Sequence, residues 1–218
     1  MVPLGNLQSI ALFIALITQT AAMFTITAEP GTDMWRKPPS TDVFSAPTAS
    51  EPEAVIHNAL NKFVSATVSF KFTPEVQYDQ AGIVLALRPR GAANATGIPP
   101  KWIKSGIEFY QGVPRMGTVG TDTWSDWSIA PVATESGSAS SKGVSWTTVL
   151  VEKHVDELGD SLWVYQVNGE ERLPLREINW PFGYGDEWEL KVEAYAAKPG
   201  SGAPLEVEFK DFAVQWKD

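Results

Sequence analysis

The chain has 218 residues, no cysteine, two histidines and a formal net charge of −9. Without cysteine there are no disulfides or thiolate metal sites, and two histidines are too few for a multi-imidazole site, so we predict no metal and no cofactor. Lys and Arg are scattered and outnumbered by Asp and Glu, which argues against nucleic acid or a membrane as partner. The length suits one large domain, which we place at residues 23–218.

The first 22 residues carry no charged side chain. Their apolar run, residues 10–17 (IALFIALI), is too short to cross a bilayer but has the length of a signal-peptide core, and Thr20 and Ala22 are small enough for a cleavage site. We therefore predict a signal peptide and secretion, and Asn94, in an Asn-Ala-Thr sequon, is then a candidate glycosylation site. Because no Lys or Arg precedes the apolar run, the alternative is a cytoplasmic protein translated from Met23.

Short runs of alternating apolar residues, separated by Gly, Pro, Asn and Asp, follow from residue 24 to the end. This spacing is typical of a β-sandwich or barrel. Residues 51–62 (EPEAVIHNALNK) are the best candidate for one or two helical turns. Roughly ten to twelve strands are too many for one small sheet, so we predict two packed antiparallel sheets. The expected strands are residues 24–27, 63–72, 82–88, 102–110, 124–129, 145–153, 160–167, 172–178, 187–197 and 205–216.

The patterns of two of these runs predict which strand faces are buried. Residues 82–88 (GIVLALR) are apolar on both faces, which indicates a central strand covered on both sides. Residues 102–110 (WIKSGIEFY) alternate, which predicts one face toward the core and one away from it. The core face carries Ile103, Ile107 and Phe109, and the other face carries Trp102, Lys104, Glu108 and Tyr110.

Six strings stand in order along the chain: TDMWRKPP (32–39), YDQAGI (78–83), WIKSGIEF (102–109), SDWS (125–128), LREINW (175–180) and EVEFKDFAV (206–214). Together they resemble the concanavalin A-like family of domains of unknown function that includes the regulation-of-enolase proteins. The sandwich domain appended to some β-xylosidases is similar in a more distant way. The resemblance covers about residues 24–216 and implies a jelly-roll sandwich of two antiparallel sheets, with no settled activity.

Candidate ligand-binding residues come from three places. The outward face of residues 102–110 predicts a polar, aromatic-rimmed concave surface, and an internal Lys–Glu pair with packing across the sheet is the alternative. Asp79 and Gln80 precede a buried strand and could bind sugar hydroxyls or cap a turn. Asp126 and Trp127 are surface candidates, with packing as the other role for Trp127.

Catalysis by a carboxylate pair is the remaining possibility. Glu206-x-Glu208-x-x-Asp211 is similar to the Glu-x-Asp-x-x-Glu pattern of sandwich glycanases with the acid types changed. Alternation puts Asp211 on the other strand face, so a solvated face is favoured and no catalytic residue is assigned.

Three functions follow, in order of preference. The first is a non-catalytic module that binds carbohydrate through a Trp-rich concave sheet face. The second is an intracellular protein-interaction or regulatory module of central carbon metabolism, as the family resemblance suggests. The third is a glycoside hydrolase or lyase.

Overall fold

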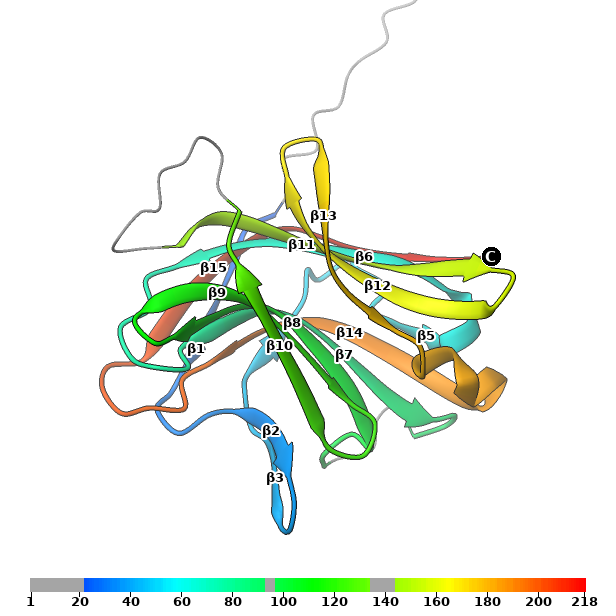
Figure 1. Ribbon diagram of the computed structural model, residues 1–218, viewed down its shortest axis with the longest axis horizontal. Helices are drawn as coiled ribbons and strands as arrows, with labels where there is room; N and C mark the ends of the chain where they lie inside the picture. Colours follow the sequence, from blue (N-terminus) through cyan, green and yellow to red (C-terminus); the bar gives the residue numbers. More distant parts are fainter. Residues whose placement is uncertain (1–21, 93–96, 134–143) are drawn as a thin grey trace, which may run out of the picture.

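The computed structural model describes residues 22–92, 97–133 and 144–218 (Figure 1). Within these ranges the helical segments are two short 3-10 turns, η1 (Leu60–Lys62) and η3 (Pro181–Glu187). The strands are β1 (Phe24–Ala28), β2 (Met34–Lys37), β3 (Thr41–Phe44), β4 (Thr48–Ala49), β5 (His57–Ala59), β6 (Phe63–Phe72), β7 (Gln80–Pro89), β8 (Lys101–Tyr110), β9 (Val113–Thr121), β10 (Ser125–Pro131), β11 (Val144–Asp156), β12 (Gly159–Asn168), β13 (Glu171–Ile178), β14 (Trp188–Ala197) and β15 (Leu205–Trp216).

The long strands form two antiparallel sheets that pack face to face, as Figure 1 shows. One sheet has six strands in the order β1-β15-β6-β11-β12-β13. The other has seven strands in the order β10-β9-β8-β7-β14-β4, with β5 also paired to β14. The predicted all-β jelly-roll sandwich of two antiparallel sheets is therefore confirmed.

The main core lies between the two sheets. Strand alternation directs Ile83 and Leu85 of β7 toward Val68 and Phe70 of β6, and all four side chains are buried. Val84, on the opposite face of β7, is buried as well. The prediction of a central strand covered on both faces is confirmed, because a second layer covers that opposite face.

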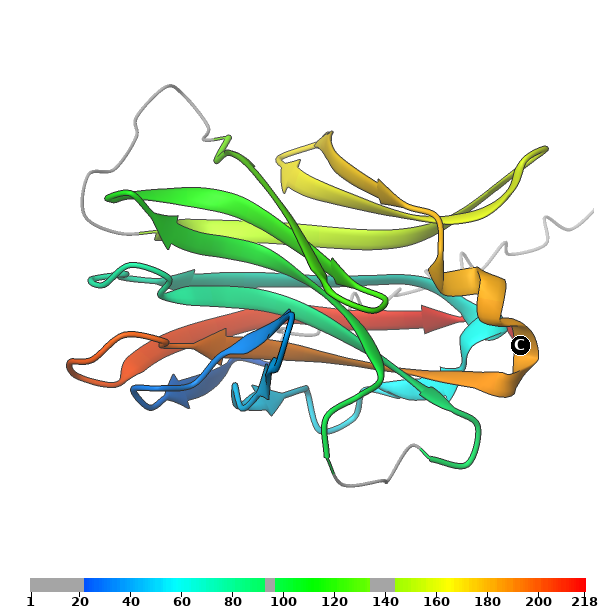
Figure 2. The same ribbon diagram turned by 60° about the horizontal axis from the view of Figure 1, so that its bottom comes forward.

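The second layer is the hairpin formed by β2 and β3, which lies in front of the seven-stranded sheet in Figure 2. Its base supplies Met34 and Phe44, and Phe44 packs edge-on against Trp102 with 6.0 Å between ring centroids. The Arg36 guanidinium fastens the hairpin by donating to the carbonyl oxygens of Pro99 and Pro100 at 3.1 and 2.8 Å. The buried cluster beneath the hairpin comprises Met34, Ala46, Val84, Trp102, Val119, Tyr195 and Ala197.

The sequence predictions failed at three points. Residues 51–62, expected to hold one or two helical turns, contain the strand β5 and the single 3-10 turn η1, and β9 was missed because it alternates weakly. Strict alternation along residues 63–72 predicts Phe63 on the same face as Ser65, but Phe63 is fully buried in the core. A register shift between Gln215 and Trp216 of the neighbouring β15 accompanies this change of face.

A buried ion pair joins the loop before β7 to the end of β14. Lys198 Nζ lies 3.2 and 3.3 Å from the two carboxylate oxygens of Asp79, and both side chains are buried. Asp79 Oδ2 also accepts hydrogen bonds from the backbone N–H groups of Glu75 and Val76 at 2.9 and 3.0 Å. The carboxylate therefore shapes the 75–79 turn and neutralises a buried ammonium at once.

Asp79→Ala should lower the free energy of unfolding by about 3–5 kcal/mol, because Lys198 would stay buried without a counter-charge. Glu208→Ala is the matched control, since Glu208 pairs with Lys71 at 3.0 Å in a more exposed position. That pair should contribute less than about 1 kcal/mol. Urea unfolding measures both variants, and equal effects would contradict the structural role given to Asp79.

Candidate functional site

Beside the hairpin, three neighbouring strands place glycines in one cross-strand row. Gly82 of β7 pairs with Gly106 of β8, and Gly106 pairs with Gly117 of β9. A Cβ on Gly82 or Gly106 would lie 2.1 or 2.0 Å from a backbone oxygen of the partner strand, so the close approach of β7 and β8 requires glycine at both. The nearest atoms that a Cβ on Gly117 would meet belong to the Glu108 and Trp127 side chains, at 3.4–3.6 Å, so this third glycine lets these two side chains lie close against β9.

Lys104 of β8 is buried on this sheet face next to the glycine row. Its ammonium donates to Gln80 Oε1 at 2.6 Å and lies 3.9 Å from Asp33 Oδ1. Gln80 Nε2 in turn donates to the same Asp33 oxygen at 3.3 Å. Burial lowers the pKa of the Lys104 ammonium, and the charges of Glu108 and Asp33 oppose this lowering.

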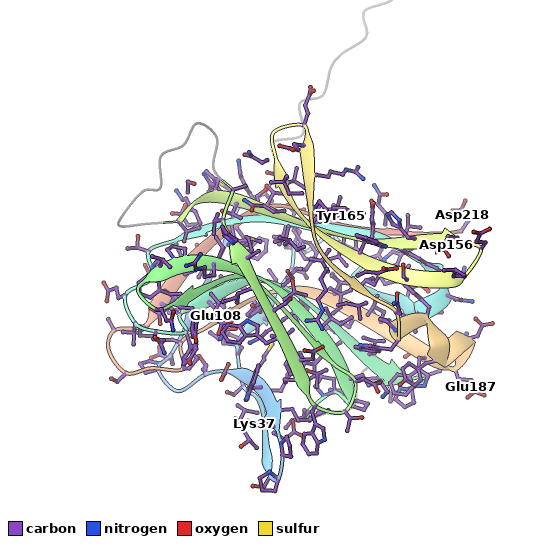
Figure 3. The ribbon with its side chains drawn as sticks, in the orientation of Figure 1. Lys37, Glu108, Asp156, Tyr165, Glu187 and Asp218 are labelled. Atoms are coloured by element: carbon purple, nitrogen blue, oxygen red, sulfur yellow. The ribbon has the colours of Figure 1, made fainter. Side chains whose placement is uncertain are left out.

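Glu108 follows on the same face of β8 and is only partly buried; Figure 3 labels its position on the sheet. Burial raises the pKa of its carboxyl, Lys104 counteracts the rise, and the Asp33 carboxylate adds to it. Burial also raises the pKa of the Tyr195 phenol of β14, with the charges of Glu108 and Asp33 adding to the rise. The phenol therefore stays protonated and is a hydrogen-bond donor at neutral pH.

Trp127 of β10 approaches Gly117 and Glu108 from the edge strand of the sheet. Its Nε1 and the Oε2 of Glu108 each lie 3.4 Å from the point where a Cβ on Gly117 would be. The Trp127 Nε1–H is buried, and within the described part of the chain it has no hydrogen-bond partner. A buried N–H without a partner costs about 1–3 kcal/mol, so an oxygen that reached it would be bound favourably.

An aromatic row extends from Trp127 along the open side of this face. Tyr110 packs edge-on against Trp127 with ring centroids 5.1 Å apart, and Tyr78 stacks on Tyr110 at 6.0 Å. Tyr78 has a positive φ of 72°, unusual for an aromatic residue, and its N–H donates to the Phe109 carbonyl at 2.7 Å. Two further exposed apolar side chains, Val113 and Ile129, stand opposite Tyr110 and Gly117 in the strand register.

These residues define the candidate site, which comprises Asp33, Tyr78, Gln80, Lys104, Glu108, Tyr110, Gly117, Trp127 and Tyr195. Five of them were singled out from the sequence, namely Gln80, Lys104, Glu108, Tyr110 and Trp127. The internal pairing considered for Lys104 is present in part, because its hydrogen bond goes to Gln80 while Glu108 acts on it through charge.

Three other candidates lie elsewhere. Trp102 shares the sheet face but is fully covered by the hairpin, so it offers no surface for a ligand. Asp79 is fully buried and caps the 75–79 turn, which was the alternative role considered for it. Asp126 is exposed and accepts a hydrogen bond from Arg176 of β13. It therefore joins β10 to β13 and does not contribute to the site. Asn94 lies outside the described residues.

The acidic motif near the C-terminus occupies the other sheet. Glu206 and Glu208 of β15 line a polar cavity of about 790 Å³ together with Thr25 and Lys71. Glu208 is paired with Lys71, and Asp211 sits at a register shift with φ 53°. None of the candidate-site residues lines this cavity. At the Glu108 site, by contrast, a buried donor that has no partner among the described residues lies near a carboxylate of raised pKa.

Sequence reasoning missed Asp33, Tyr78, Tyr195 and the role of Gly117. Tyr195 could have been identified from the sequence, because it shares a strand face with Glu193 in the predicted strand at residues 187–197. Asp33 was not, because it joins Lys104 only after the β2–β3 hairpin has folded onto the sheet.

Within residues 22–92, 97–133 and 144–218, no group of three or more His, Cys, Asp or Glu side chains could hold a metal ion. The same ranges contain no helix that is both long and apolar enough to span a membrane.

Residues 15–217 match the family described as protein of unknown function (DUF1349), and the chain belongs to that family. A relative from Emericella nidulans, named uncharacterized protein AN7484, is 35% identical over 200 residues, which is 90% of this chain and 88% of the relative. The crystal structure of a functionally unknown protein from Saccharomyces cerevisiae is similar with a TM-score of 0.64 and 20% identity, covering 92% of this chain and 93% of that one. This second likeness shows the shared fold. The alginate lyase from Klebsiella pneumoniae is less similar, with a TM-score of 0.45 and 10% identity over 72% of this chain and 61% of the lyase.

Glu108→Gln should make the folded protein more stable at neutral pH. Because the folded-state pKa of Glu108 is raised, its contribution to stability is fully present below the unfolded pKa, near 4.5, and is lost as pH rises through the folded pKa. Glutamine stays neutral, so the variant should exceed the wild type at pH 7 and equal it below about pH 4. Thermal unfolding across this pH range measures the difference, and a variant less stable than wild type at pH 7 would contradict the assigned electrostatics.

Proposed function

We propose that this domain binds carbohydrate at the uncovered part of the seven-stranded sheet, around Glu108 and Trp127. One observation carries the proposal: the buried Trp127 Nε1–H has no hydrogen-bond partner among the described residues, and this atom and Glu108 Oε2 each lie 3.4 Å from the point where a Cβ on Gly117 would be. A sugar hydroxyl accepts a hydrogen bond and donates another. One hydroxyl could therefore satisfy both groups once the Glu108 side chain turns away from Gly117.

The aromatic row supports the same ligand class. Tyr78, Tyr110 and Trp127 present ring surfaces next to the polar groups, and Val113 and Ile129 extend the apolar border. The apolar face of a pyranose can pack on such rings while its hydroxyls reach the polar atoms. An apolar frame with a few converging polar groups is the usual form of a small-ligand site.

Charge favours a neutral sugar over an acidic one. The Lys104 ammonium is buried and already bound by Gln80, so it is poorly placed to meet a carboxylate of a ligand. Asp33 and Glu108 are both negative when ionised, the chain as a whole carries −9, and Arg115 is the cation opposite Glu108 in the strand register. A uronate seated between Asp33 and Glu108 would be repelled by both carboxylates, whereas hydroxyl groups would find acceptors.

A glycoside hydrolase or lyase is the second candidate, because the carboxyl of Glu108 has the raised pKa expected of a proton donor. If the domain is an enzyme of this kind, Glu108→Gln should lower product release from the bound polysaccharide by about 100-fold or more. If the wild-type protein binds a polysaccharide and leaves it intact, the proposal of a non-catalytic module stands.

The third candidate is the protein-interaction module of carbon metabolism. The exposed apolar border suits a protein side chain too, so a pull-down with the same variants tests it.

Glu108→Gln and Trp127→Phe should each weaken sugar binding. Removing a charged acceptor corresponds to about 1.5–3 kcal/mol, or roughly 10–100-fold in Kd, and removing the indole N–H to about tenfold. Titration calorimetry with neutral oligosaccharides of glucose, xylose, mannose and N-acetylglucosamine measures the change against the wild type.

Asp126→Asn is the matched control, since Asp126 neighbours Trp127 in sequence but lies outside the site. It should bind like the wild type. The proposal is wrong if no neutral sugar binds at millimolar concentration, or if Asp126→Asn weakens binding as much as Glu108→Gln does.

A further inference from the structure

Resting on the proposed function, we infer that this site takes the end of a sugar chain and excludes its interior. An extended sugar chain runs straight across its binding surface, so a surface that binds the interior of such a chain must be open on two opposite borders. Here two adjoining borders are closed.

The first closed border lies along β8 toward its start. Trp102 is fully buried beneath Met34 and Phe44, and it precedes Glu108 by six residues on the same strand face, or about 20 Å. Arg36 holds the hairpin at this end through the carbonyl oxygens of Pro99 and Pro100, and its N–H donates to Ser125 Oγ at 2.9 Å. The hairpin projects from the sheet as a wall, with Lys37 near its tip (Figure 3).

The second closed border lies across the strands toward β14. Gln80, Tyr195 and Ala197 belong to the sheet face beyond Glu108, yet their exposed fractions are only 1%, 2% and 0%. The segment that covers them includes Asp33 and Ala46, since the N–H groups of residues 45 and 46 both donate to the Asp33 carbonyl, at 2.8 and 3.2 Å. These two hydrogen bonds join the two arms of the covering segment, and Gln80 Nε2 ties the segment to the sheet by donating to Asp33 Oδ1 at 3.3 Å.

The remaining borders are open. Toward the end of β8 the site meets Tyr110, Tyr78 and Val113, and toward β10 it meets Ile129. Tyr78, Val113 and Ile129 are exposed by 38%, 41% and 42%. A sugar seated on Trp127 and Glu108 can therefore continue toward these open borders, whereas the two walls block a chain that would continue in the opposite directions.

A length series tests this directly with the native chain. Linear oligosaccharides from one to six units, of glucose, xylose, mannose and N-acetylglucosamine, are titrated while the Trp127 indole N–H is followed by ¹⁵N NMR, with its peak assigned from Trp127→Phe. We expect the indole peak to move, and Kd to change by less than about threefold from the disaccharide to the hexasaccharide, because a disaccharide already spans the Trp127 and Tyr110 rings, whose centroids lie 5.1 Å apart, and further units extend past the end of β8. A cyclic oligosaccharide of the sugar that binds, having no chain end, should not move the peak.

Two results would overturn the inference, and they are distinguishable. A Kd that falls more than about tenfold between disaccharide and hexasaccharide, or binding of the cyclic ligand at the indole, would show recognition of the chain interior and leave the carbohydrate proposal standing. An indole peak unmoved by every sugar in the series would remove the carbohydrate proposal and this inference together.

Discussion

The packing of the β2–β3 hairpin onto Trp102 is the contact on which the rest of the candidate site depends. A tryptophan and two aliphatic side chains on one sheet face would otherwise be exposed to water, and an aromatic side chain of this size buries about 150–250 Å². The hairpin removes this apolar surface and ends before Glu108. It thereby divides one sheet face into a covered apolar part and an uncovered part with polar groups.

The same cover explains the electrostatics of the uncovered part. Once the hairpin and the segment at Asp33 lie over the sheet, Lys104 is buried and needs acceptors, which Gln80 supplies by a hydrogen bond and Asp33 by charge. Asp33 then raises the pKa of Glu108, in addition to the larger effect of burial. Part of the rise in the Glu108 pKa thus comes from a residue seventy-five positions earlier in the chain.

This dependence on distant residues sets the limit of what the sequence could predict. Alternation is a local property, so the doubly covered strand β7 and the core positions of Ile103 and Ile107 in β8 were predicted correctly from residues 82–88 and 102–110 alone, whereas Phe109 is only partly buried and lies outside the core clusters. Exposure is not local. Trp102 and Lys104 stand on the predicted face, but nothing near them in sequence indicates that residues 33–46 will cover them. The change of face at Phe63 was unpredictable for a related reason, because the irregularity exists only in the pairing of β6 with β15, where Gln215 pairs with Ser65 and Trp216 with Phe63.

The uncovered part carries two features that work against stability in the free protein: a carboxylate whose ionised form is disfavoured by burial, and an indole N–H that has no partner among the described residues. Glu108 belongs to neither hydrophobic core, whereas the Trp127 ring packs against the cluster beneath the hairpin, and Gly117 lets both side chains lie against β9 at this point. A hydroxyl that accepted from Trp127 and donated to Glu108 would favour the ionised carboxylate and the folded state together. The local instability of the free protein would then become part of the binding free energy, which gives a physical reason for a sheet face to combine a glycine, a glutamate and a tryptophan at one point.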